Sequence, residues 1–244
     1  MSDRRRAFLA ALLLAVAGLS GCQGITSTSA QLRVIDASPD AGVIDSYQNS
    51  SALAYNLGFG TMTSYIPMSP GVYNLAAYKA GTRQTLVANS ETLAANRQYT
   101  EIIGAGLANL QQTLIVDQST PAPNGRIAIR VINQTTRAGG VDVYLVPAGS
   151  AAGKGSSSAL AINLGFGANS GYIDLPEGTY AIDVVPTGTL LTSSTVTLFS
   201  GAQVAYASGA VRTVVLIDQA TLGAQHAALT PGVQAIVADD ADAQ

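Results

Sequence analysis

Short runs rich in Val, Ile, Leu, Thr and Tyr, separated by Gly, Pro, Asn and Ser, occupy the chain from residue 32 onward. Segments 72–78 and 179–185 are examples, and each follows a glycine. The apolar residues show no sustained 3.6-residue period, which a long amphipathic helix would require. About seven or eight such runs per hundred residues predict an all-β fold, namely β-sandwiches of either immunoglobulin-like or transthyretin-like kind.

The pattern occurs twice, which predicts two tandem domains. Its most specific part is Asn-Leu-Gly-Phe-Gly, present without change at residues 56–60 and 163–167. Shorter matches surround it: Arg33-Val34-Ile35 with Arg130-Val131-Ile132, Asp45 and Tyr47 with Asp142 and Tyr144, Tyr65-Ile66 with Tyr172-Ile173, and Gly71 and Tyr73 with Gly178 and Tyr180. The closing apolar strands also correspond, 114–118 with 215–219, because each ends in Asp-Gln.

These matches set the expected boundaries along the chain. They are a signal peptide at 1–21, a lipidated cysteine and tether at 22–31, a first sandwich at 32–118, a linker at 119–125, a second sandwich at 126–219 and a C-terminal tail at 220–244. The extra length of the second copy falls in the Gly/Ser-rich stretch 147–158, as expected for a loop. The tail either frays or adds an edge strand at 233–237. In the first copy, Ser69-Pro70-Gly71-Val72 suits a type II turn with Gly71 at positive φ.

The first 22 residues carry an export signal. A basic start, Arg4-Arg5-Arg6, precedes an apolar run that is too short to span a bilayer. Leu19-Ser20-Gly21-Cys22 then resembles a lipobox, which predicts that Cys22 carries diacylglyceryl and acyl groups such as palmitate. The arginines fit either general export or a twin-arginine signal. Gln23 at the next position favours the outer membrane, so we expect a lipoprotein of the bacterial cell envelope.

Charge and cysteine content narrow the function classes. The chain has 12 basic and 15 acidic residues, and removal of residues 1–21 takes away three arginines and one aspartate. An acidic mature chain argues against nucleic-acid binding, which needs a basic surface. Cys22 is the only cysteine, so its lipidation leaves no thiol for a disulfide or a metal. The expected membrane contact is through the lipid anchor alone.

Four motifs of the first copy together resemble a known family. They are Arg-Val-x-x-Ala-Ser-Pro-Asp-Ala at 33–41, Asp-x-Tyr at 45–47, Asn-Leu-x-Phe-Gly at 56–60 and Pro-Gly-x-Tyr at 70–73. Their combination resembles the bacterial domain of unknown function catalogued as number 4397, which occurs in exported and lipid-anchored proteins, often in tandem. The resemblance implies β-sandwich domains. It implies no established activity, so it assigns no functional residues.

Groups for catalysis or metal binding are scarce. A hydrolase triad needs a base, and the only histidine, His226, lies in the tail. Asp36, Asp40 and Asp45 could converge on Ca²⁺. The second copy has Asn133, Arg137 and Asp142 at these places, which excludes a shared site. A site private to the first copy and simple turn carboxylates both remain open. We expect no enzyme activity, no catalytic residue, no cofactor and no metal.

Aromatic residues are the best candidates for recognition. Phe59 and Phe166 lie between glycines, where they either form exposed rings for a glycan or protein partner or pack into the core. Tyr65 and Tyr172 are paired candidates, and Tyr73 and Tyr78 could extend such a face. The sequence therefore predicts a lipid-anchored envelope protein with a non-catalytic binding, adhesion or structural role. The alternative is a periplasm-facing accessory or assembly factor of an outer-membrane complex.

Overall fold

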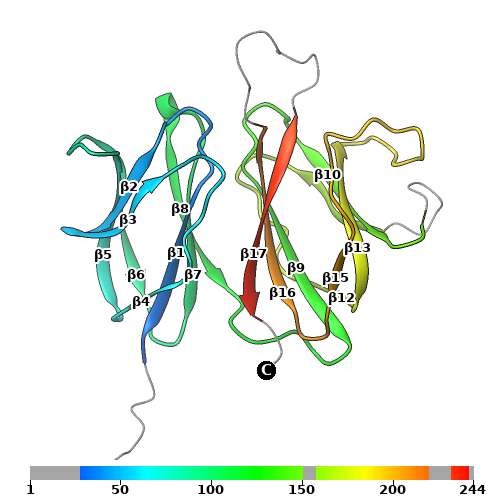
Figure 1. The fold of residues 1–244 in the computed structure, drawn as a ribbon, viewed down its shortest axis with the longest axis horizontal. Helices are drawn as coiled ribbons and strands as arrows, with labels where there is room; N and C mark the ends of the chain where they lie inside the picture. Colours follow the sequence, from blue (N-terminus) through cyan, green and yellow to red (C-terminus); the bar gives the residue numbers. More distant parts are fainter. Residues whose placement is uncertain (1–27, 151–157, 220–231, 242–244) are drawn as a thin grey trace, which may run out of the picture.

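The computed structural model describes residues 28–150, 158–219 and 232–241, which form two β-sandwiches side by side (Figure 1). The first sandwich holds eight strands: β1 (Ala30–Asp36), β2 (Ile44–Gln48), β3 (Ser51–Leu57), β4 (Ile66–Met68), β5 (Gly71–Lys79), β6 (Thr85–Leu93), β7 (Gln98–Gly104) and β8 (Gln111–Asp117). One 3₁₀ turn, η1 (Leu107–Asn109), precedes β8. The all-β prediction is confirmed.

The second sandwich repeats this plan. Its strands are β9 (Arg126–Asn133), β10 (Val141–Pro147), β11 (Ser158–Leu164), β12 (Ile173–Pro176), β13 (Gly178–Pro186), β14 (Phe199–Ser200), β15 (Val204–Tyr206), β16 (Val211–Asp218) and β17 (Val233–Ala241). One sheet of the first sandwich has the order β4-β1-β7-β8, and one of the second has β12-β9-β16-β17. The other sheets are β3-β2-β5-β6 and β11-β10-β13-β14, with β15 also paired to β13. In both sandwiches the first strand runs parallel to the next-to-last strand, β1 to β7 and β9 to β16.

Alternation along β1 explains how this strand is buried on both sides. Leu32 and Val34 belong to apolar clusters inside the first sandwich. Arg33 and Ile35 point the other way, as neighbours in a strand must, and are covered by the second sandwich. A strand with polar and apolar outward positions can be fully buried only because a second layer covers it.

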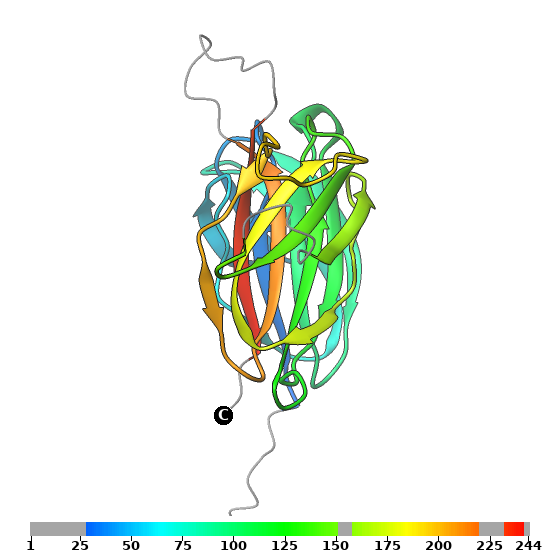
Figure 2. The same ribbon diagram turned by 90° about the vertical axis from the view of Figure 1, so that its right-hand side faces the viewer.

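The two central sheets, β4-β1-β7-β8 and β12-β9-β16-β17, face each other (Figure 1). In Figure 2 the second sandwich lies in front of the first, and strands of both run roughly along the vertical of the view. Both sandwiches contribute to one apolar cluster at this contact: Ile35, Ala37 and Ile102 from the first, and Ile132, Val215 and Ile217 from the second. The linker is also packed, since Ala122 is buried against the second sandwich.

The closing strands differ from the sequence prediction. Residues 215–218 lie in β16, which pairs in parallel with β9 and therefore corresponds to β7. Residues 114–117 lie in β8, whose counterpart at the sheet edge is β17. The two Asp-Gln segments thus occupy different strands. The second sandwich also includes β17 at its sheet edge, which agrees with the edge-strand alternative for residues 233–237 and extends it to Ala241.

The Asp-x-Tyr and Asn-Leu-Gly-Phe-Gly motifs have one structural role in both sandwiches. Asp45 accepts hydrogen bonds from the backbone N–H groups of Asn56 and Gly81, both at 2.9 Å. Asp142 accepts from Asn163 at 2.7 Å and Gly188 at 2.9 Å. Asn56 and Asn163 have φ of 54° and 51°, a region that Asn tolerates better than most residues. The motifs therefore fix how two loops meet β2 and β10.

Gly71 does not adopt the positive φ expected for a type II turn, because it already belongs to β5. A tyrosine ring two residues later lies over this glycine. Tyr73 folds back so that its hydroxyl donates to the Ser69 carbonyl at 2.7 Å, and the ring passes over Gly71. Tyr180 does the same with Pro176 at 2.9 Å, over Gly178.

Several predictions concern residues outside the described part of the chain. They include the signal peptide, Cys22, Gln23 and His226. Within the described ranges, no helix has the length and apolarity needed to cross a membrane.

Candidate binding surface

Three tyrosines lie on the outer face of the sheet β3-β2-β5-β6, away from the second sandwich. Tyr47 is on β2, Tyr55 on β3 and Tyr78 on β5. Strand alternation puts Tyr47 and Tyr78 there, because Ile44 and Ala77, on the opposite face of the same strands, belong to the core. Tyr55 lies on β3, where the pairing with β2 has register shifts. We call Tyr47, Tyr55 and Tyr78 the tyrosine face.

The three rings form a contiguous group. Tyr47 makes edge-to-face contacts with both others, at centroid separations of 6.0 Å to Tyr55 and 5.1 Å to Tyr78. Tyr55 is 64% exposed, an unusual position for a large ring. The neighbouring Tyr55 is the main reason that the pKa of Tyr47 is raised. The tyrosine face therefore presents both ring surface and hydroxyl groups to solvent.

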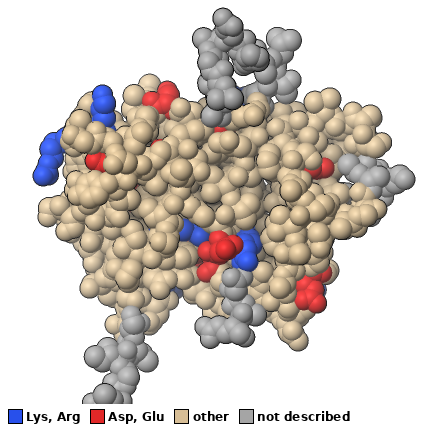
Figure 3. Space-filling view, in the orientation of Figure 1, with Lys and Arg blue, Asp and Glu red and all other residues tan. Residues whose placement is uncertain are grey.

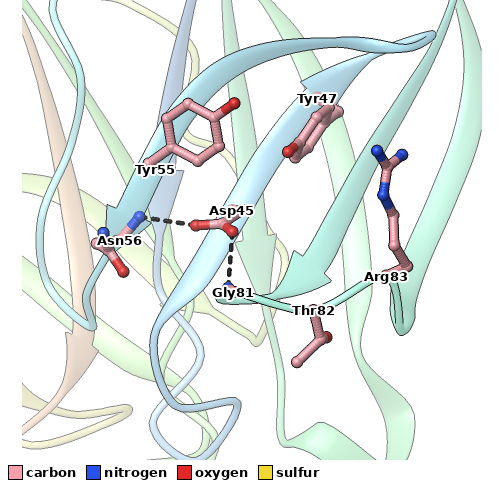
Figure 4. Close-up of a pocket in the computed structure, with 7 residues that line it drawn as sticks. All are labelled: Asp45, Tyr47, Tyr55, Asn56, Gly81, Thr82 and Arg83. Carbon is pink, nitrogen blue, oxygen red and sulfur yellow. Dashed lines mark hydrogen bonds between the residues drawn. The ribbon is translucent and has the colours of Figure 1, made fainter.

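A pocket of about 440 Å³ opens beside the tyrosine face. It is lined by Asp45, Tyr47, Tyr55, Asn56, Gly81, Thr82 and Arg83 (Figure 4). Both Asp45 oxygens already accept the backbone N–H groups of the Asn56 and Gly81 loops. Its carboxylate is thus part of the wall, while the Arg83 side chain reaches up beside Tyr47 from the β5–β6 turn.

The equivalent face of the second sandwich is built differently. Tyr144 corresponds to Tyr47, but Ile162 and Val185 take the places of Tyr55 and Tyr78. Val185 is fully buried in a cluster with Leu191, from the segment between β13 and β14. The second sandwich thus covers part of this face with its own chain, and the first leaves it open.

The structure separates the two predicted phenylalanines. Phe59 is partly buried and packs against the apolar cluster shared by the sandwiches. A Cβ on the adjacent Gly60 would lie 3.3 Å from Ile217, so this loop touches the second sandwich. Phe166 is 37% exposed, and nothing lies within 4 Å of a Cβ placed on Gly167. Identical sequences therefore have different surroundings, and neither ring lies on the tyrosine face.

Tyr65 and Tyr172, the other predicted pair, lie in a polar network between the sandwiches. The Tyr65 hydroxyl donates to Asp117 at 2.7 Å, and that of Tyr172 donates to Asp240 at 2.8 Å. Their rings lie under the guanidinium groups of Arg33 and Arg130, at 4.7 and 4.5 Å. Burial is the first cause that raises the pKa of both tyrosines. Both tyrosines are only partly buried, and their hydroxyl groups are engaged by the protein itself.

The carboxylates considered for Ca²⁺ have separate roles. Asp36 is fully buried and accepts from the Ser38 N–H at 3.0 Å. Asp40 accepts from the Leu107 N–H at 2.7 Å, and Asp45 is occupied as described. Among the residues that the structure describes, no three His, Cys, Asp or Glu side chains are grouped to hold a metal.

Sequence reasoning missed Tyr55 and Arg83 and used Tyr47 only as a repeat marker. Alternation along a strand places Asp45 and Tyr47 on the same face, and Tyr78 lies on a later strand, so part of the tyrosine face could have been found from the sequence. The pairing of β2 with β3 and β5 was needed to bring the three rings together.

Comparisons with known proteins give little functional guidance. No curated protein matches the sequence. The family CBM26 module of Eubacterium rectale, solved with maltoheptaose, is 9% identical over 86% of this chain and 96% of its own, with a TM-score of 0.25. A leucine-rich repeat protein of Bacteroides thetaiotaomicron is 14% identical over 76% of this chain and 25% of its own, with a TM-score of 0.18.

The Bacillus anthracis TIE protein is 9% identical over 87% of this chain and 44% of its own, with a TM-score of 0.21. Likenesses this weak carry no argument about ligands. The sequence itself gives a more specific match, which spans the whole first sandwich, the linker, β9 and the start of β10. Residues 30–144 match the family described as domain of unknown function DUF4397.

Proposed function

We propose that this protein is a non-catalytic glycan-binding protein of the bacterial cell envelope, and that the tyrosine face is its contact surface. The observation that carries the proposal is the open group of three touching rings, Tyr47, Tyr55 and Tyr78, on a rigid sheet. Tyrosine supplies a large contact area with few rotatable bonds and a polar hydroxyl. Sugars present the matching chemistry, a C–H face bordered by hydroxyl groups.

The comparison of the two sandwiches supports this assignment. In the second sandwich Leu191 packs against the fully buried Val185, whereas Tyr78, the counterpart of Val185, is only partly buried. An exposed aromatic group of this kind marks a contact surface more often than it serves stability. Asn56 and Thr82 at the pocket add polar groups that can contact sugar hydroxyls.

Anchoring belongs to the same proposal. Acylation at Cys22 would hold the sandwiches on a membrane through the residues that precede β1, and Gln23 favours the outer membrane. The second sandwich is then a diverged copy that fixes the orientation of the first. The polar contacts between the two sandwiches support the view that they act together as one unit, with a single binding surface on the first sandwich.

Affinity electrophoresis of the mature chain through gels containing neutral or acidic polysaccharides tests the proposal. We expect retardation by at least one polysaccharide, lost in Tyr55→Ala and kept in Ile162→Ala, its counterpart on the second sandwich. Equal retardation of both variants would refute the role of the tyrosine face. No retardation by any polysaccharide would refute glycan binding and favour the accessory-factor alternative.

Protease treatment of intact cells addresses orientation. Cleavage of the two sandwiches would support surface display, where external glycans are accessible. Complete protection would instead support the alternative, a periplasm-facing factor that docks on an outer-membrane complex.

A further inference from the structure

We infer that the ligand of the tyrosine face is an anionic glycan, and that Arg83 binds its acidic group; this inference rests on the proposed function. Arg83 lies in the turn between β5 and β6 and lines the same pocket as Tyr47 and Tyr55. Figure 4 shows Tyr47 between the Tyr55 ring and the Arg83 guanidinium. A sugar on the rings would therefore have a cation beside it.

Five other arginines of the described chain contact protein groups, and the exposed Arg97 lies at the β6–β7 turn, outside this pocket. Arg33, Arg130, Arg137 and Arg212 form ion pairs with aspartates. Arg126 donates to the Asp174 carbonyl at 3.4 Å. Arg83 is exposed and forms none of the ion pairs found among the described residues. Its guanidinium is available to a ligand.

The pocket lacks an accessible counter-charge for Arg83. Its only carboxylate, Asp45, is 4% exposed, and each of its oxygens accepts a loop N–H. Figure 3 shows basic side chains projecting at the outer edge of the first sandwich, while most of this view is uncharged. The pocket thus exposes a guanidinium and no accessible carboxylate, on a chain of net charge −3.

A sugar carboxylate fits this arrangement best. A guanidinium binds a carboxylate through two parallel N–H···O bonds, which Lys cannot reproduce. A uronic acid combines that carboxylate with a ring whose C–H face can lie on Tyr47 or Tyr55. A sugar phosphate is also anionic, so the test includes separate probes for a carboxylate and for a phosphate.

The test uses the mature chain and three immobilised probes: an oligogalacturonide, the same oligosaccharide with methyl-esterified carboxyl groups, and a phosphorylated oligosaccharide of equal length. We expect the oligogalacturonide to bind at least about tenfold more tightly than the ester, the gain of a charged hydrogen-bonded contact. Arg83→Gln should remove that preference. Arg97→Gln, an exposed arginine at the β6–β7 turn, should keep it.

The outcomes distinguish this inference from the proposed function. Equal binding of acid and ester that still requires Tyr55 would overturn the role of Arg83 and leave glycan binding intact. Stronger binding of the phosphorylated probe than of the oligogalacturonide, dependent on Arg83, would support the anionic site and overturn the choice of carboxylate. Loss of all binding in Tyr55→Ala with no effect of Arg83→Gln would also overturn the inference.

Discussion

Arg33 on β1, opposite Thr100 of β7, donates to Asp240 on β17, a strand of the other sandwich. The reverse contact also exists, because Arg130 donates to Asp117 of the first sandwich at 2.5 Å. Each aspartate further accepts from a threonine of its own sandwich, Thr100 or Thr213, at 2.6 Å. The contact therefore has approximate two-fold symmetry, as expected when two copies of one domain pack through the same sheet.

Arg33→Met should lower the free energy of unfolding by about 3 kcal/mol, because it leaves Asp240 buried without its cation. Both side chains are almost fully buried, so solvent does not compensate. Urea unfolding measures the loss. Arg97→Met, at an exposed position, serves as the control and should change stability by less than about 0.5 kcal/mol. Equal effects of the two substitutions would show that the cross-sandwich pair has no special weight.

Arg33→Met combined with Asp240→Leu should recover much of that loss. The double variant removes both charges and fills the space with apolar groups, which buried pairs often tolerate. A double-mutant cycle from the same unfolding curves gives the coupling energy. Losses that simply add would contradict a direct interaction between these two side chains.

Phe59→Ala should destabilise the protein by about 2 kcal/mol, and Phe166→Ala by less than about 1 kcal/mol. Phe59 packs against the cluster shared by both sandwiches, whereas Phe166 is exposed. The two substitutions are chemically identical in identical five-residue motifs, so each is the control for the other. Thermal unfolding measures the difference, and a larger effect of Phe166→Ala would contradict the placement of these loops.

Asp36→Asn should stabilise the protein at pH 7 and above. Burial raises the pKa of Asp36 from its ordinary value of 3.8 to about 7, and one of its oxygens has no hydrogen-bond partner. Its counterpart Asn133 donates its amide N–H to the Leu164 carbonyl at 2.8 Å. An amide at position 36 supplies a donor without a charge. Unchanged or lower stability, measured by urea unfolding at pH 8, would contradict this account.

Stability should fall as the pH rises from about 4 to about 7. Burial also raises the pKa of Glu101, from 4.5 to about 7. Between the unfolded and folded pKa values the folded state holds more protons, so the free energy of unfolding decreases with rising pH. Asp36→Asn and Glu101→Gln together should flatten this slope. A slope unchanged in the double variant would assign it to other groups.

The strands and their repeat could be predicted because alternation and turn residues are local signals. The Asp-x-Tyr motif was likewise visible, since Asp45 and Asp142 hold equivalent loops. The contact between sandwiches was not predictable, because it depends on which face of β1 and β9 meets another layer. The same dependence explains why Phe59 is covered and Phe166 is not. Both 114–118 and 215–219 end in Asp-Gln by chance, and this similarity hid the fact that the structural counterpart of β8 is β17.

The tyrosine face could not be predicted from the sequence, because the strand order brings its three rings together. Its exposure became clear only by comparison with the equivalent face of the second sandwich. Leu191 lies well apart in sequence from Val146 and the rest of the face that it covers. The cover is visible only in the structure, where Leu191 packs against Val146 and Val185 of the paired strands β10 and β13.

The most direct test of the account is the affinity of the mature chain for an acidic oligosaccharide, measured by titration calorimetry with Tyr55→Ala and Ile162→Ala side by side. Unfolding curves of both variants should match the parent chain, since both side chains are largely exposed. The account predicts that Tyr55→Ala weakens binding at least about tenfold and that Ile162→Ala leaves it unchanged. Unchanged affinity in a correctly folded Tyr55→Ala would contradict the tyrosine face as the binding surface.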